Sequence, residues 1–103
     1  MSMTFAVKVA QEIFMVRIFR TKYATGNTAI QLFDAQTSEQ FAVLSVNTGV
    51  ALPEGHFYLK HWSENAPIVL ALKPALIECS EHAPQQMGYV VSRCYTLADR
   101  YEV

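Results

Sequence analysis

The chain has 103 residues, of which 51% are apolar and 17% are charged, and its formal net charge is −1. This length predicts a single domain over residues 1–103, large enough to form one core without disulfides or a structural metal. The charge balance excludes the strongly basic surface with which many proteins hold nucleic acid or an anionic membrane, because neither half of the chain is strongly basic.

Alternation of apolar and polar residues predicts strands through the first half of the chain. In the second of these strands, Phe14, Val16 and Ile18 fall on one face. Gly26 and Asp34 supply turns, because glycine tolerates positive φ and aspartate initiates turns. The five expected strands cover residues 4–10, 13–23, 29–33, 41–47 and 56–62.

A helix is predicted directly after the fifth strand. Ser63 or Asn65 can cap its N-terminus with a side-chain oxygen. Pro67 suits a first turn, where its missing N–H costs nothing, and Pro74 ends the helix near Leu72. The stretch WSENAP therefore has two interpretations, as the junction between a strand and a helix or as a functional site. The capping pattern favours the junction.

The remaining chain is predicted to form a loop over residues 78–88 and a last strand over residues 89–97. Short connections between the early strands favour antiparallel pairing of neighbours. The predicted fold class is therefore α+β, with one antiparallel meander sheet of five or six strands and one helix packed on a face.

Two cysteines, Cys79 and Cys94, are too few for the disulfide framework of a small secreted domain. The N-terminal segment lacks a basic region followed by a long apolar run, and no apolar stretch is long enough to span a membrane. We expect a cytoplasmic protein with reduced thiols, no cofactor and no membrane partner.

A zinc site could be drawn from the pair Cys79 and His82 together with Cys94 and His61. Zinc prefers four such ligands, usually supplied as two close pairs, and this chain has one close pair. Catalysis by either thiol is disfavoured, because Cys94 lies within a predicted strand and Cys79 has acidic neighbours, which raise a thiol pKa. The sequence therefore predicts neither a metal site nor a catalytic residue.

Arg17, Phe19 and Tyr23 share one face of the second strand, a basic and aromatic pattern that can stack single-stranded bases. Arg20 and Lys22 lie close by on the opposite face. Binding of single-stranded nucleic acid through these five residues is the alternative function, and the mild acidity of the chain argues against it.

The shortage of charge has two explanations. A small domain with few ionic side chains either covers itself with Ser, Thr, Gln and Asn or leaves an apolar face for a partner. We favour the second explanation, which predicts a non-enzymatic protein-binding module that forms a homo-oligomer. Exposed aromatic residues are typical interface anchors, although Trp62 would serve equally well in the core. The predicted partner-binding residues are Tyr23, Tyr58, Lys60, Trp62 and Glu64.

Four motifs of the chain stand in a fixed order: a Gly-Asn turn before Ala-Ile-x-Leu, a Leu-x-Val-Asn run, a Leu-Pro-x-Gly turn, and Trp-Ser-Glu-Asn before the helix. Their residues are Tyr23, Gly26, Asn27, Ala29, Ile30, Leu32, Leu44, Val46, Asn47, Leu52, Pro53, Gly55, Trp62, Ser63, Glu64 and Asn65. Together they resemble a family of small uncharacterised proteins, a domain of unknown function from bacterial plasmids, phages and integrated elements. The resemblance covers about residues 14–91, with departures at Thr37-Ser38 and at Pro74.

What this resemblance implies is a biological context, since the family has no established activity. Small proteins of mobile elements often bind and block a host defence protein, as anti-CRISPR and anti-restriction proteins do. The resemblance therefore implies a mobile-element accessory factor, by association rather than from particular residues.

Overall fold

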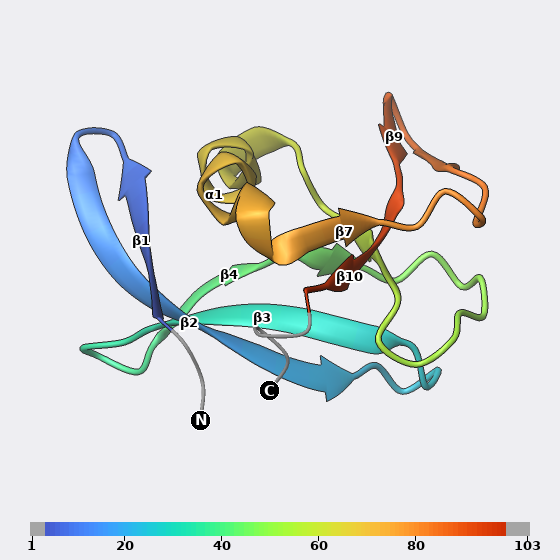
Figure 1. The fold of residues 1–103 in the computed structure, drawn as a ribbon, viewed down its shortest axis with the longest axis horizontal. Coiled ribbons are helices and arrows are strands. Elements are labelled where there is room, and N and C mark those ends of the chain that lie inside the picture. The colour runs from blue at the N-terminus through green and yellow to red at the C-terminus, as the bar shows by residue number, and fades with distance from the viewer. Residues whose placement is uncertain (1–3, 99–103) are drawn as a thin grey trace.

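The computed structural model describes residues 4–98 of the chain. Within this range it is an α+β structure with one α-helix and antiparallel strands (Figure 1). The strands are β1 (Thr4–Val9), β2 (Glu12–Lys22), β3 (Thr28–Asp34), β4 (Gln40–Val43), β5 (Ser45–Val46), β6 (Phe57–Leu59), β7 (Leu76–Glu78), β8 (Gln85–Met87), β9 (Val90–Ser92) and β10 (Cys94–Leu97). The helices are α1 (Ala66–Leu72) and the short 3-10 helices η1 (Ser63–Asn65) and η2 (Lys73–Ala75).

The strands divide into two sheets and a separate hairpin. The first sheet is an antiparallel meander in the order β1-β2-β3-β4, and the second sheet has the order β5-β6-β10-β7. Among residues 4–98, strands β8 and β9 pair only with each other. The predicted α+β class with one helix and antiparallel pairing is confirmed. The single meander of five or six strands is not confirmed, because the meander has four strands and the later strands form the second sheet.

The predicted strand over residues 41–47 is shared between the two sheets and changes partner at Leu44. The backbone N–H of Leu44 donates to the carbonyl of Ile30 in the first sheet at 2.9 Å, and its carbonyl accepts from Lys60 N at 2.6 Å in the second sheet. Beside it, the Ser45 hydroxyl oxygen accepts from Ile30 N at 2.9 Å. This side chain satisfies a backbone donor that the regular ladder would otherwise have paired.

The core lies between the inner face of the first sheet, α1 and the second sheet. Alternation along β2 works as expected, because Val16 and Ile18 are buried and Phe14 packs against the core from its edge. Figure 1 shows α1 lying beside β1 across the concave side of the meander. The buried core residues are Val7, Val16, Ile18, Ile30, Leu32, Leu44, Phe57, Leu59, Ile68, Leu72 and Leu97.

The WSENAP stretch is a junction, as the capping pattern favoured, but neither predicted residue caps the helix. The buried Asn65 amide instead donates to the carbonyl of Val43 at 2.7 Å and to that of Lys60 at 2.9 Å. Its side chain therefore joins the end of β4 to the segment after β6. The α-helix ends at Leu72, as Pro74 predicted, and no helix of the described residues is long and apolar enough to cross a membrane.

The C-terminal third of the described chain differs most from the prediction. The expected loop over residues 78–88 contains β8, and the expected strand over residues 89–97 is interrupted at Arg93. The Arg93 carbonyl accepts from Leu59 N at 3.1 Å between β9 and β10. The β8–β9 hairpin consequently projects from the body of the molecule (Figure 1).

Candidate functional site

Two of the predicted partner-binding aromatics have structural contacts. Tyr58 could serve as an interface anchor only on an exposed face, and only 2% of it is accessible. Its hydroxyl donates to the carbonyl of Ala83 at 2.9 Å. Tyr23 is half-buried, and its hydroxyl lies 2.8 Å from the hydroxyl of Ser45, at the corner between the sheets.

The other three predicted partner-binding residues lie together after β6. Lys60 Nζ is 3.3 Å from Glu64 Oε1. A hydrogen bond from the backbone N–H of Glu64 itself, followed by the Lys60 ammonium, lowers the pKa of the Glu64 carboxyl. Trp62 is half-buried, and the edge of its ring meets His61 at a centroid distance of 5.2 Å. This segment is a locally paired surface turn rather than a set of exposed aromatic anchors.

The alternative nucleic-acid residues do not form one basic surface. Phe19 is 51% exposed on the outer face of the first sheet, with Arg17 two residues before it on the same face. Lys22 forms an ion pair with Glu54 at 2.9 Å, and Lys22 followed by Arg20 lowers the pKa of that carboxyl. Two of the three cations are therefore directed toward an acidic partner, away from the exposed Phe19 ring.

The outer face of β2 instead carries exposed apolar side chains on both sides of Arg17, a feature that sequence reasoning missed. Ile13 is 67% exposed, Met15 is 40% exposed, and the Phe19 ring contacts Phe33 edge-on at 5.8 Å. The alternation pattern placed these residues opposite the core, but it did not show that this face would be left uncovered by the described chain.

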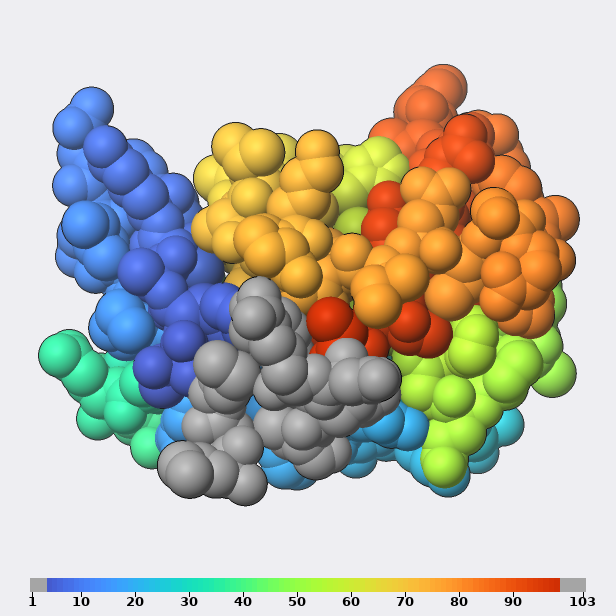
Figure 2. Space-filling view, viewed as in Figure 1, coloured from blue at the N-terminus to red at the C-terminus, as the bar shows by residue number. Residues whose placement is uncertain are grey.

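A second apolar surface is the groove between α1 and the second sheet, which we call the α1 groove. It consists of two adjoining hollows of about 420 Å³ and about 400 Å³ that share Leu59, Val69 and Tyr95. Figure 2 shows the surface hollowed between α1 and the β8–β9 hairpin. The first hollow is further lined by Ala66, Leu70, Lys73, Leu76 and Glu78, and the second by His61, Val91 and Arg93.

Charged and polar groups border the apolar floor of the α1 groove. Glu78 Oε2 lies 3.9 Å from Arg93 Nη1. Burial of the Tyr95 hydroxyl, followed by the nearby Glu78 carboxylate, raises the pKa of Tyr95. The groove therefore combines apolar lining residues with a few polar groups that can orient a bound segment, a composition common in binding sites.

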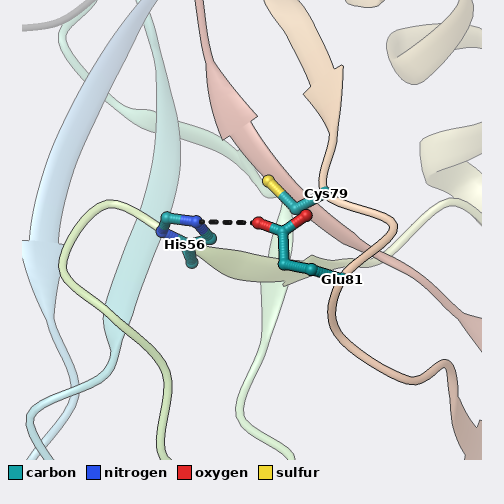
Figure 3. A group of neighbouring side chains, drawn as sticks. All are labelled: His56, Cys79 and Glu81. Atoms are coloured by element: carbon teal, nitrogen blue, oxygen red, sulfur yellow. Dashed lines mark ion pairs between the residues drawn. The ribbon is translucent and has the colours of Figure 1, made fainter.

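A cluster of metal-ligating side chains lies on another part of the second sheet. The candidate ligand atoms of His56, Cys79 and Glu81 are all within 4.8 Å of one another (Figure 3). His82 adjoins them, because its ring centroid is 5.2 Å from that of His56 and its Nε2 is 3.9 Å from Glu81 Oε1. Burial, followed by the neighbouring Cys79, raises the pKa of the Cys94 thiol to about 12.

The four candidate zinc ligands weighed in the sequence only partly meet. Cys79 neighbours Cys94, His82 N donates to the carbonyl of Cys79 at 3.3 Å, and both cysteines are free thiols. His61 lies elsewhere, with Nε2 2.9 Å from the carbonyl of Val91. His56 takes its place, and no local sequence pattern indicated it, since it is separated by more than twenty residues from Cys79.

Comparison of the chain with protein-family models, curated proteins and solved structures finds no match.

Proposed function

We propose that this protein is a non-enzymatic protein-binding module whose α1 groove holds an apolar segment of a partner protein. The observation that supports this proposal most directly is the continuous groove over Leu59, Val69 and Tyr95. On its rims, Leu70 is 72% exposed and Val91 is 43% exposed. Exposed apolar residues beside a concave surface are more typical of interfaces than of ordinary surface.

The charged groups at the groove suggest the character of the bound segment. Lys73 and Glu78 border one hollow, and Arg93 borders the other. An apolar side chain seated on Tyr95 with polar neighbours on both sides would match this pattern, because interfaces place an apolar anchor inside a polar rim. In the context implied by the family resemblance, the partner would be a host defence protein that a mobile-element accessory factor binds or inhibits.

The proposal is tested with a photo-crosslinking amino acid in place of Leu70, in protein expressed in its native host. We expect one predominant crosslinked protein, identified by mass spectrometry. With that protein purified, Leu70→Asp should weaken binding at least tenfold, a loss of about 1.4 kcal/mol, because it places a charge at the apolar rim.

Ile77→Asp is the matched control. Ile77 is 50% exposed on β7, and strand alternation directs it away from the groove that its neighbours Leu76 and Glu78 line. This variant should bind the partner normally. Equal loss in both variants, or no loss in Leu70→Asp, would show that the groove is not the binding site.

Titration with a labelled single-stranded oligonucleotide separates this proposal from the alternative function. We expect no binding even at low salt, because Arg20 and Lys22 are directed toward Glu54. Tight binding that weakens steeply with salt would instead favour the nucleic-acid function.

A further inference from the structure

We infer that His56, Cys79, Glu81 and His82 form a zinc-binding site. These residues come from two segments that are far apart in the sequence, the loop before β6 and the loop between β7 and β8. The site is separate from the α1 groove, since the two share none of their lining residues.

The distances from Glu81 to the two imidazoles are compatible with ligands that share one ion. Glu81 Oε1 is 3.8 Å from His56 Nε2 and 3.9 Å from His82 Nε2. Both separations exceed the roughly 2.7–3.2 Å of a hydrogen bond between nitrogen and oxygen. Ligand atoms around a tetrahedral zinc ion, with bonds of about 2.0–2.3 Å, stand roughly 3.3–3.8 Å apart. Side-chain rotations would bring His56, Cys79 and Glu81 onto one ion, and His82 would join them from its position beside Glu81.

The donor set selects the metal. A thiolate, two imidazole nitrogens and a carboxylate oxygen are the ligand types that zinc prefers, in the number that a closed tetrahedral site requires. Calcium and magnesium are disfavoured because they prefer oxygen ligands, and the cluster offers one carboxylate.

Backbone hydrogen bonds hold the ligands in place before any ion binds. Cys79 N donates to the carbonyl of Cys94 at 2.8 Å, which fixes the start of the ligand loop against β10. His82 N donates to the carbonyl of Cys79 at 3.3 Å, so a tight turn brings Glu81 and His82 back toward the thiol. Prior positioning of this kind reduces the conformational cost of binding a metal.

The two loops are also anchored from outside the cluster. His56 N donates to the carbonyl of Pro53 at 3.1 Å, and Tyr58 beneath it donates to the carbonyl of Ala83 at 2.9 Å. The site would therefore tie the segment before β6 to the segment after β7. Since a bound ion stabilises the folded form, it should raise the melting temperature of the chain.

The inference is tested on the full chain, stripped with a chelator and kept reduced with a phosphine. Titration with zinc should give one ion per chain by elemental analysis and an upward shift in Tm that the chelator reverses. Titration with cobalt should give the thiolate-to-metal charge-transfer band of a site that contains cysteine.

Variants assign the ligands. Cys79→Ser should abolish the charge-transfer band, and His56→Ala should weaken zinc binding at least tenfold. His56 is the safer test of folding, because its side chain is partly exposed on a loop. The matched controls are His61→Ala, which removes an imidazole outside the cluster, and Cys94→Ser, which removes the neighbouring thiol. Both should bind zinc as the unaltered chain does.

Two outcomes would overturn the inference. These are no stoichiometric zinc uptake at micromolar concentration by the reduced chain, and zinc binding unchanged in both His56→Ala and Cys79→Ser. Circular dichroism of each variant confirms that a loss of binding is not a loss of folding.

Discussion

Ala10 and Gln11, between β1 and β2, both adopt a left-handed backbone conformation, with φ of 50° and 75°. The strand partners Val9 and Glu12 flank them, so the connection is a two-residue hairpin loop. Such loops usually contain Asn-Gly, because each central residue needs positive φ. The β1–β2 loop is therefore strained, because Ala10 and Gln11 both carry a Cβ that disfavours positive φ.

We expect the double substitution Ala10→Asn and Gln11→Gly to raise the free energy of unfolding by about 1 kcal/mol, because it removes the cost of left-handed backbone at residues with a Cβ. Urea denaturation measures the change. Gly55→Ala is the opposing control, since Gly55 has φ of +85° and alanine there should lower stability. An unchanged urea midpoint in the double variant would show that the β1–β2 loop is not strained.

Asp34 gives the chain a pH-dependent turn. Its carboxylate oxygen accepts from Gln36 N at 2.8 Å and from Thr37 N at 3.0 Å. The Thr37 N–H, followed by the Gln36 N–H, lowers the pKa of the carboxyl below its ordinary 3.8. Because the folded pKa is the lower one, the stabilisation is complete above the unfolded pKa and is lost as pH falls through the folded value.

Thermal melts of the unaltered chain and of Asp34→Asn between pH 2 and pH 7 test this dependence. The asparagine can still accept in the turn but does not titrate, so its Tm should fall less steeply below about pH 4. Glu39→Gln, in the same exposed loop, should leave the profile of the unaltered chain in place. Parallel profiles for all three proteins would show that the Asp34 carboxylate does not contribute.

At the scale of elements, local sequence predicts those parts whose signals are local. The β2–β3 hairpin follows from alternation and from Gly26, and the end of α1 follows from Pro74. The switch of sheets at Leu44 depends on Ile30 and Lys60, which are distant in the sequence. No periodic pattern contains that information.

The cap of the helix shows the same limit in one side chain. Asn65 is a favoured capping residue, and it stands at the expected place before Ala66. Its amide nitrogen instead donates to the carbonyls of Val43 and Lys60, which come into reach only after the sheets form. Tertiary demand for a buried donor outweighs the local preference.

The candidate site divides in the same way. Cys79 and His82 stand close together in the sequence, at a spacing that zinc ligands can have. His56 reaches them only because β6 and β7 both pair with β10. Similarly, Leu59 and Tyr95 in the α1 groove are adjacent through sheet order rather than through sequence.

At the scale of the whole molecule, the outer face of β2 is the surface most suited to self-association. Ile13, Met15 and Phe19 are all at least 40% exposed on one strand face. Arg17 lies between Met15 and Phe19 on this face. Exposed apolar residues gathered on one face favour coverage by another protein surface. We therefore expect a second copy of the chain to cover this face.

Light scattering on the purified chain should give the mass of a dimer, and Ile13→Lys with Phe19→Lys should give a monomer, because the charges would meet across a symmetric interface. Leu70→Lys, on the rim of the α1 groove, should leave the dimer intact. A strict monomer at high concentration would exclude this arrangement.

The backbone at Leu44 belongs to both sheets at once, through a bond to Ile30 on one side and a bond from Lys60 on the other. Unfolding of either sheet therefore disturbs the backbone hydrogen bonds of Leu44 with the other sheet. Melting should consequently spread across the body in one concerted event rather than stepwise. Binding of a metal ion at the loops, or of a partner segment in the α1 groove, would for that reason stabilise regions of the fold that the ligand does not contact.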